Sequence, residues 1–430
     1  MPTGAEVDDY IARLGYDDDA ATDHDRIELI AALERLKGAA AAAQARVTFA
    51  FDRSQRAEQA DLGVPSSEQG QGVASQVALA RHDSPARGGR HLGLARALVA
   101  EMPRTLQELA AGRISEWRAT ILVRETAVLS AEHRRRVDEE LGSRLAVLGD
   151  RGVEREAKRI AYRLDPASFM RRNRGAEADR RVTVRPAPDT MSLVTGFLPV
   201  AQGVAVHAAL TAHADSLRAG GDARSRGQIM ADTFVERLTG QSTADAVPVE
   251  VQLLMTDHAL LTDDRTPARV VGHGPVPAAL ARTLLRSTDA QVWLRRLFTS
   301  PTTGELVALD SRRRTFPAGI RSFLIARDEV CRTPWCDAPI RHADHVVRAA
   351  DGGPTSADNG QGLCQRCNQA KEAPGWAATR TRAGPIHLPG AITVLTPTGH
   401  AYESTLPTLP GRPSPVTPME RRFAELVRAA

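Results

Sequence analysis

The chain has 430 residues, of which 42% are hydrophobic and only 4% aromatic. This length suggests two or three domains at about 150 residues each, and a core built mainly from Ala, Leu and Val favours helices. No run of about eighteen apolar residues occurs, so neither a transmembrane helix nor a membrane partner is expected. The first ten residues contain no basic and no apolar segment, so no secretory signal is expected and the predicted location is cytoplasmic.

The positive charge of the chain is carried almost entirely by arginine. The net charge is +4 and the sequence pI is about 9.1, while lysine occurs only at Lys37, Lys158 and Lys371. Arginine makes bidentate contacts with phosphate, so an Arg-rich surface suits a nucleic-acid partner. A GC-rich coding sequence that uses Arg wherever Lys would serve is an equally good explanation, because a small net charge is a weak electrostatic signal.

Helical periodicity dominates the first part of the chain. Ile27, Ile30, Leu33 and Leu36 recur at three-residue steps and predict a half-buried helix from about residue 23 to 51. Residues 60–76 are rich in Gly, Ser, Gln and Pro and predict a mobile loop or linker.

Capping residues divide the next segment into an all-helical bundle. A helix over 102–111 should end at Gly112. Ser115 should cap a helix running to about residue 129, and Ser130 should cap another running to about residue 141. A fourth helix, over 153–164, should stop at Asp165 and Pro166.

Shorter elements are expected beyond this bundle. Alternating residues predict a hairpin over 181–185 and 191–198, a strand over 247–255, and a second hairpin over 291–298 and 306–309. Helices are expected up to residues 220 and 240 and over 317–327. The last part is Pro-rich and reads as a loose tail, with one strand over 392–395 and a short helix over 418–430.

All four cysteines lie in one stretch, as two pairs: Cys331 with Cys336, and Cys364 with Cys367. Two such pairs brought together by a hairpin can point four sulfurs at one ion, which predicts a structural zinc site. Two disulfides, or four unrelated buried thiols, are the alternatives. The reducing compartment expected for this chain favours the metal.

The same stretch contains the groups that phosphodiester hydrolysis needs. His345 can act as a general base near neutral pH. The oxygens of Asp344 and Asn368 suit Mg²⁺ or Mn²⁺ better than zinc. Asn368 and Lys371 are three residues apart on a predicted helix and so share a face. Because side chains alternate along a strand, Asp344 and His345 can serve one site if the backbone bends or bulges there, or if Asp344 reaches the metal from the edge of the strand.

Residues from Cys331 to Trp376 resemble the HNH endonuclease motif, a ββα-metal nuclease module. The resemblance is carried by CRTPWC at 331–336, DHVV at 344–347, DGGP at 351–354, DN at 358–359 and LCQRCNQAK at 363–371. It implies that Asp344 and Asn368 hold a catalytic Mg²⁺ or Mn²⁺, that His345 is the base, and that Asn359 ties the loop to the strand and orients the base. Where many members have His after the last zinc cysteine, this chain has Asn368, and neutral amide oxygen is a poorer ligand for softer ions.

Four cationic side chains near this motif are candidates for contacts with nucleic acid. They are Arg341, Arg348, Arg366 and Lys371. The resemblance gives Lys371 a contact with phosphate or backbone. The three arginines are equally well explained as solvated surface.

Residues from about 23 to 310 are similar to a helical domain of unknown function, number 222, which precedes an HNH domain in many actinobacterial proteins. The matching text is LARAL at 94–98, LQELAAGRI at 106–114 and SRGQIMAD at 225–232. The predicted fold is therefore mainly α: a helical domain with small β-hairpins over 1–310, a zinc-bound ββα-metal HNH module over 317–380, and a Pro-rich tail over 381–430.

The predicted function is a metal-dependent HNH endonuclease that hydrolyses DNA, with RNA as an alternative substrate. A catalytically inactive, zinc-dependent DNA-binding or regulatory protein is the competing interpretation. Retention of Asp344, His345 and Lys371 favours the enzyme, whereas Asn368 and Gln369 favour the binder. The sequence does not predict the oligomeric state.

Overall fold

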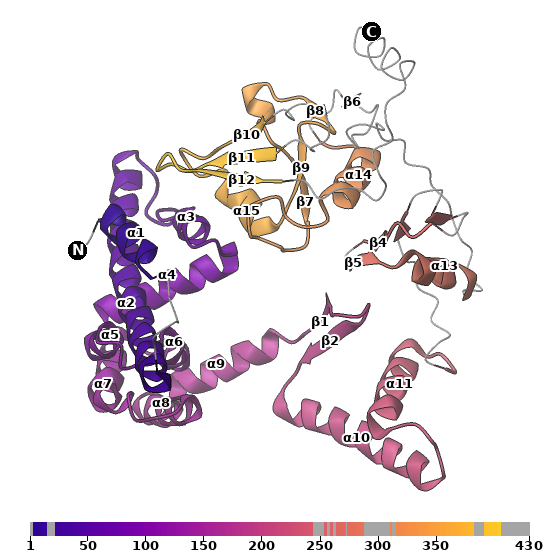
Figure 1. Cartoon of the computed structure of the whole chain (residues 1–430), viewed down its shortest axis with the longest axis horizontal. Helices are drawn as coiled ribbons and strands as arrows, with labels where there is room; N and C mark the ends of the chain where they lie inside the picture. Colours follow the sequence, from indigo (N-terminus) through magenta and orange to yellow (C-terminus); the bar gives the residue numbers. More distant parts are fainter. Residues whose placement is uncertain are drawn as a thin grey trace. The chain divides into compact units, whose positions relative to one another are not determined.

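The computed structural model describes residues 3–14, 22–243, 253–255, 259–260, 264–271, 273–287, 310–311, 315–381 and 391–405. The chain forms two compact units. Residues 1–65 and 90–172 make up the first unit, and residues 66–89 and 173–430 the second. Helices dominate and the sheets are small and antiparallel, as the sequence predicts (Figure 1). Among the described helices, none combines the length and the apolar character needed to cross a membrane.

The first unit is entirely helical. Its elements are α1 (Gly4–Ala12), α2 (Asp23–Asp61), α4 (Pro85–Ala100, which begins in the second unit), α5 (Pro103–Ala110), α6 (Glu116–Glu125), α7 (Ala131–Leu141), the 3₁₀ turn η1 (Gly142–Arg144), α8 (Asp150–Leu164) and the start of α9 (Pro166–Ala178). Ser115 and Ser130 cap α6 and α7, as predicted. Gly112 follows α5 with a φ of +67°, and a Cβ there would lie 2.5 Å from the backbone of Arg35.

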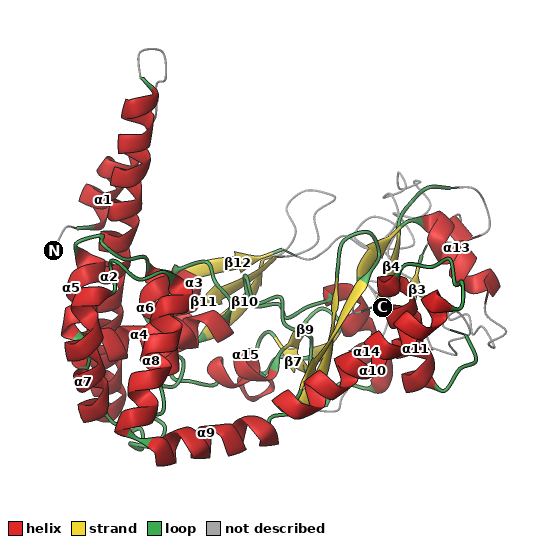
Figure 2. Cartoon of the chain, turned by 90° about the horizontal axis from the view of Figure 1, so that it is seen from below, coloured by secondary structure: helices red, strands yellow, loops and turns green. Residues whose placement is uncertain are grey.

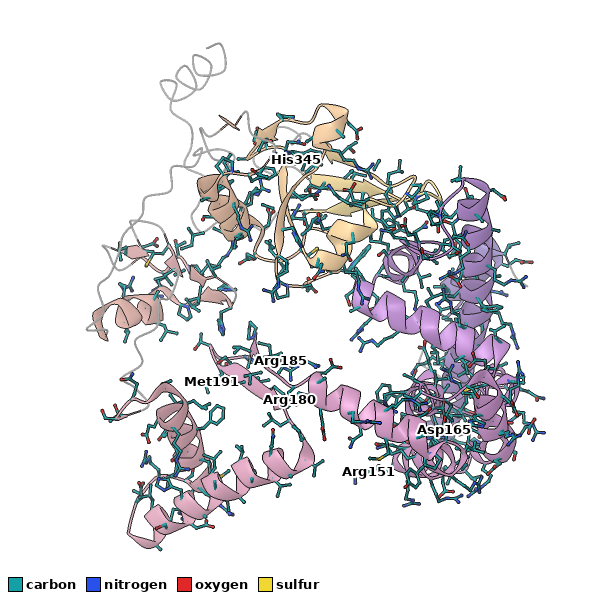
Figure 3. All side chains as sticks on the ribbon, turned by 180° about the vertical axis from the view of Figure 1, so that it is seen from behind. Arg151, Asp165, Arg180, Arg185, Met191 and His345 are labelled. Carbon is teal, nitrogen blue, oxygen red and sulfur yellow. The ribbon has the colours of Figure 1, made fainter. Side chains whose placement is uncertain are left out.

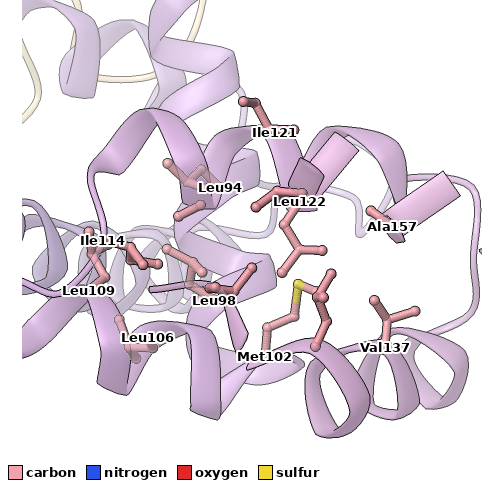
Figure 4. Close-up of a cluster of buried hydrophobic side chains, with 14 of the residues drawn as sticks. Leu94, Leu98, Met102, Leu106, Leu109, Ile114, Ile121, Leu122, Val137 and Ala157 are labelled. Atoms are coloured by element: carbon pink, nitrogen blue, oxygen red, sulfur yellow. The ribbon is translucent and has the colours of Figure 1, made fainter. Parts of the chain in front are cut away.

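The core of the first unit is aliphatic and centres on side chains from α4 to α8. Leu98, Met102 and Leu122 lie at its middle and are fully buried (Figure 4). The helix predicted over 23–51 is α2, and it is only partly buried, as predicted. Ile27 and Ile30 are 66% and 62% exposed, and Figure 2 shows the N-terminal half of α2 extending past the helices of the core.

The buried half of α2 is its Ala-rich part. Gly38, Ala41, Ala42 and Ala45 are buried there. A Cβ at Gly38 would lie 3.0 Å from Gly112, so the small residues allow the helix backbones to approach closely. Periodicity predicted the helix, but it did not indicate which part of α2 meets the core.

The second unit contains the remaining elements. They are α3 (Val73–Ala80), β1 (Arg181–Pro186), β2 (Ser192–Phe197), α10 (Val200–Ala219), α11 (Arg226–Thr239), β3 (Leu253–Leu254), β4 (Ala268–Val270), β5 (Gly274–Val276), α13 (Ala278–Ser287), β6 (Asp310–Ser311), α14 (Ala318–Asp328), β7 (His342–His345), the 3₁₀ turn η2 (Ala349–Asp351), β8 (Thr355–Ser356), β9 (Gly360–Leu363), α15 (Gln365–Ala370), β10 (Ala377–Thr381), β11 (Ala391–Leu395) and β12 (Ala401–Ser404).

Several predicted elements of this unit are present. The first hairpin is β1 and β2, with Arg181 opposite Phe197, and the two predicted helices are α10 and α11. The helix predicted over 317–327 is α14. Of the strand expected over 247–255, only its last residues lie in the described part, where β3 pairs with β4. The hairpin expected over 291–298 and 306–309 and the helix over 418–430 lie outside the described residues.

Two segments are more ordered than their composition suggested. The linker expected over 60–76 is wrong for its last four residues, because Val73, Ser75 and Gln76 are buried in α3. The Pro-rich tail contains β11 and β12, which form an antiparallel sheet with β10. Leu79 of α3 and Val394 and Tyr402 of the tail pack with Trp376, and Thr398 of the tail donates to Gln76 of α3. Sequence patterns could not relate α3 to residues about 300 positions away.

A buried carboxylate closes the N-terminal end of α5. Asp138 on α7 accepts hydrogen bonds from the amides of Arg104 and Thr105 at 2.7 and 2.8 Å, and it is 1% exposed. Met102, at the N-cap position, supplies no side-chain cap. Asp138 therefore performs the capping role from another helix.

We expect Asp138→Ala to lower the free energy of unfolding of the helical unit by about 3 kcal/mol, because two amides lose their acceptor inside the core. Urea unfolding followed by circular dichroism measures this loss. Glu132→Ala, on the exposed face of the same helix, is the matched control and should cost less than about 0.5 kcal/mol. Equal losses for both variants would contradict the capping role.

Candidate metal centre and catalytic site

Four sulfurs converge between α14 and α15. The Sγ atoms of Cys331, Cys336, Cys364 and Cys367 all lie within 4.8 Å of one another, and every one of these residues is buried. The Sγ atom of Cys336 is 3.7 Å from that of Cys364 and 3.6 Å from that of Cys367. A disulfide would need about 2.05 Å. A tetrahedral zinc site with bonds of about 2.3 Å has sulfur–sulfur edges of about 3.8 Å, so the cluster fits one metal ion.

The backbone holds both cysteine pairs in tight turns. The amide of Cys331 donates to Ala338 O at 2.8 Å, and the amide of Cys336 donates to Thr333 O at 3.1 Å. Cys364 is the N-cap of α15, where its sulfur accepts from the amide of Cys367 at 3.4 Å. An N–H group aimed at sulfur favours the thiolate, which is the form that binds metal.

The thiols perturb one another because they are crowded and buried. Hydrogen bonding with the thiol of Cys331 raises the pKa of Cys336 and of Cys367, and it lowers the pKa of Cys364. Four neighbouring thiols cannot all lose their protons unless a cation lies among them. Metal binding at this cluster must therefore release protons, and acid must weaken it.

His345 ends β7 and is held in a buried position. Its Nε2 atom lies 2.9 Å from Thr355 Oγ1 on β8, and its ring centroid lies 4.6 Å from that of Phe316. Its carbonyl oxygen accepts from Gln361 Nε2 at 3.1 Å and from Lys371 Nζ at 2.9 Å. His345 is 7% exposed, and Figure 3 shows it inside the strands of this module. The ring is thus fixed in orientation by contacts on several sides.

Asn359 ties the loop after β7 back onto the strand. Its Oδ1 accepts from the amide of Val347 at 2.9 Å, and its Nδ2 donates to Val347 O at 3.0 Å and to Pro354 O at 2.9 Å. Both ends of the amide are used. This side chain acts on the shape of the loop between His345 and Thr355.

The two predicted oxygen ligands of a catalytic ion are Asp344 on β7 and Asn368 on α15. Both Asp344 Oδ2 and Asn368 Oδ1 are buried. Asn368 Oδ1 accepts no hydrogen bond from any described residue, whereas Asp344 Oδ2 forms an ion pair with Lys371 Nζ. An unsatisfied amide oxygen and a buried carboxylate suit a hard divalent cation, so these residues fit the group that the sequence implies.

Asp344 and His345 contact different sides of the module. Asp344 contacts Lys371 of α15, whereas His345 contacts Phe316 and Thr355. The pairing of β7 with β9 is regular, with Asp344 opposite Gln361 and His345 opposite Gly360. The strand therefore keeps its normal alternation here and has no bulge.

The predicted nucleic-acid contacts differ in how strongly they are held. Arg341 is exposed, and within the described part of the chain its hydrogen bonds involve only its backbone, with Leu363 and Arg321 as partners. Arg366 Nη1 donates to Pro85 O at 3.0 Å, and Arg348 donates to Lys371 O. Lys371 is 16% exposed and bound to Asp344 and His345. Arg341 is the most available of the four.

Sequence reasoning missed the residues that support this site. Thr355 and Phe316 orient His345, but neither belongs to the motif. Arg327 and Asp328, at the end of α14, form a buried ion pair with an N–O distance of 2.7 Å. Asp328 also accepts from the amide of Gly362 at 2.7 Å, and Arg327 donates to Gly360 O at 2.8 Å. In the sequence, the only indication of this role is that two opposite charges stand next to each other at the end of an apolar helix.

We expect one zinc ion per chain at the four cysteines. Binding energy at a structural zinc is folding energy of about 10–16 kcal/mol, so Cys364→Ser should lose the metal and unfold the module around α15. Elemental analysis and limited proteolysis measure both effects. Gln365→Ala, an exposed neighbour, is the control and should keep the metal. A folded module without zinc, purified under reducing conditions, would refute the site.

Two family models match consecutive parts of the chain. The family described as domain of unknown function (DUF222) matches residues 26–328, and the family described as HNH endonuclease matches residues 329–373. The second match contains all four cysteines with Asp344, His345, Asn359, Asn368 and Lys371. No curated protein and no solved structure matches this chain. The chain therefore belongs to the DUF222 family and carries an HNH endonuclease domain at residues 329–373.

Proposed function

We propose that the HNH domain is a metal-dependent endonuclease that hydrolyses phosphodiester bonds in DNA. The observation that carries this proposal is the buried Asn368 Oδ1, which has no hydrogen-bond donor among the described residues, together with the buried carboxylate of Asp344, which is paired with Lys371. Leaving the amide oxygen unsatisfied costs free energy in a protein that needs only a fold. A divalent cation, as Mg²⁺ or Mn²⁺, would bind both groups, and the chemistry it supplies is neutralisation of charge on the phosphate.

In this proposal His345 is the general base. The Thr355 hydroxyl and the Phe316 ring keep the imidazole in one orientation. A neutral imidazole keeps one lone pair, which would take the proton of the attacking water. Asn359 acts as a positioning residue, because it fixes the loop between His345 and Thr355. Lys371, which is paired with Asp344, would supply positive charge for the phosphate when Asp344 holds a cation.

The zinc cluster has a structural role in this proposal. Its four ligands are all thiolates, which leaves no open position for water or substrate. DNA is the proposed partner because HNH endonucleases act on nucleic acids, and RNA is an outcome of the substrate test. We propose a cytoplasmic location because free thiols stay reduced there.

A second candidate function has its own support. Lys371 already neutralises Asp344, and Asp344 and His345 contact opposite sides of a regular strand. Both features, together with the amide of Asn368, suit a zinc-dependent DNA-binding or regulatory protein without catalysis. The two functions differ in a single measurable property, the cleavage of bound nucleic acid.

We expect the purified protein to nick supercoiled plasmid in Mg²⁺ or Mn²⁺, and His345→Ala to slow cleavage at least about 100-fold. Base catalysis acts in the transition state, so zinc content and DNA affinity should stay unchanged. His342→Ala, an exposed histidine on the same strand, is the matched control and should retain activity. Asp344→Ala should instead raise the metal concentration needed for cleavage.

The metal should be withdrawn by omitting Mg²⁺, because strong chelators also remove zinc and would confuse the two sites. Wild-type protein that binds DNA or RNA but cuts neither with Mg²⁺, Mn²⁺, Co²⁺ or Ni²⁺ would overturn the enzyme proposal. The binding-protein proposal would then replace it. Equal loss of activity in His342→Ala and His345→Ala would argue against His345 as the base.

We expect duplex affinity to fall steeply with salt, and Arg341→Ala to lower the slope of log K against log salt by about one unit. Arg341 is exposed and its side chain is not engaged elsewhere in the described residues. Arg366→Ala is the comparison and should change the slope less, because Pro85 O already holds that guanidinium. Salt titrations of fluorescence anisotropy measure both. If only Arg366→Ala lowers the slope, the phosphate contact belongs to Arg366 of α15 rather than to Arg341.

A further inference from the structure

Residues 66–89 lie within the DUF222 match but fold with the HNH domain. They belong to the same compact unit as residues 173–430, while the chain on both sides of them belongs to the other unit. We call residues 66–89 the strap. The strap contains α3 and the first residues of α4, and it is about 280 residues away from α15 in sequence.

Apolar contacts seal the strap against the segment that follows α15. Leu79 of α3 packs with Ala373 and Trp376, and these residues are 1%, 2% and 7% exposed. Val394 and Tyr402 of the neighbouring sheet join the same cluster. Six of the eight residues of α3 are buried, which a loosely attached helix would not show.

Polar contacts reach α15 itself. Gln71 Nε2 donates to Gln369 O at 3.2 Å, and Arg366 Nη1 donates to Pro85 O at 3.0 Å. Thr398 Oγ1 donates to Gln76 Oε1 at 3.1 Å. Helix α15 has only six residues, too few to be stable alone, so its position depends on neighbours of this kind.

A ring contact reaches the first zinc turn. His82 stacks on Trp335, which lies between Cys331 and Cys336, with ring centroids 4.3 Å apart and planes 15° apart. Trp335 in turn meets the edge of Tyr402 at 6.0 Å. The strap thus contacts the turn that holds one cysteine pair and the helix that holds the other.

Two glycines make this close approach possible. A Cβ at Gly72 would lie 2.7 Å from Trp376 Nε1, and the residue has a φ of +82°. A Cβ at Gly88 would lie 2.1 Å from Ala74 O, so the start of α4 packs directly on α3. Neither position accepts a larger residue without displacing the strap.

We propose that the DUF222 part supplies the strap as a positioning element of the HNH domain, which holds α15 and its zinc ligands in place. The family boundary at residue 329 therefore falls inside one folded body. Its consequence for catalysis rests on the function proposed above, since Asn368 lies in α15 and Lys371 is its C-cap residue. Its consequence for metal retention does not depend on catalysis.

The test compares the same substitution in two cores of the full-length chain. Leu79→Ala removes the apolar contact of the strap, while Leu98→Ala removes a fully buried leucine from the first unit. The readouts are the rate of zinc transfer to a chromogenic chelator and hydrogen exchange of the amides of α15. We expect Leu79→Ala to speed zinc transfer at least about tenfold and to expose α15 amides. Leu98→Ala should leave both near the wild-type values.

A milder variant keeps the proposal testable if Leu79→Ala does not fold. His82→Asn removes the ring that stacks on Trp335, and Asn tolerates the left-handed φ of 53° at this position. We expect a severalfold increase in zinc transfer. If Leu79→Ala folds, unchanged rates of zinc transfer and of α15 amide exchange would overturn the proposal. If Leu79→Ala does not fold, unchanged rates in His82→Asn would overturn it. Equal effects of Leu79→Ala and Leu98→Ala would also overturn it. Zinc transfer is measured without DNA, so a lack of nuclease activity leaves this result intact.

Discussion

The cluster of four sulfurs is the constraint on which the HNH domain depends. The elements around it are small: β7 and β9 have four residues each, and α15 has six. Its own apolar clusters are also small, with Ile320, Phe323, Leu324 and Ala357 forming one of them. Elements of this size bury too little surface to fold alone, so a metal that joins residues 331–336 to residues 364–367 contributes free energy that packing cannot.

A buried ion pair at the end of α14 fixes the position of the strands. Arg327 and Asp328 bind the backbone of β9 at Gly360 and Gly362, on either side of Gln361. Gln361 lies opposite Asp344 and donates to the carbonyl of His345. The chain of contacts therefore runs from the end of α14 through β9 to the residues of the candidate site. An ion pair buried this deeply is costly to break, because one partner alone would remain an uncompensated charge.

Local patterns predicted local structure well, and long-range contacts escaped them. The caps at Ser115 and Ser130, the hairpin of β1 and β2, and the spacing of the cysteines each depend on residues within a few positions of one another. The buried half of α2, the capping of α5 by Asp138 and the packing of Leu79 on Trp376 join residues far apart in sequence. The residue spacing in a single sequence does not indicate which distant surfaces contact each other. The candidate site was therefore predicted by its motif, while Thr355 and Phe316 were not.

The ion pair between Lys371 and Asp344 has a consequence for how the domain behaves when divalent cations are scarce. A carboxylate that had only a metal as partner would become an uncompensated buried charge whenever the metal left. Lys371 supplies an internal countercharge, so the carboxylate of Asp344 is still paired when no cation is present. Under the proposed function, loss of the divalent ion should therefore leave a folded but inactive protein, and its return should restore activity without refolding. The proposed structural zinc would then determine how long the fold lasts, and the proposed catalytic ion would determine when the protein is active.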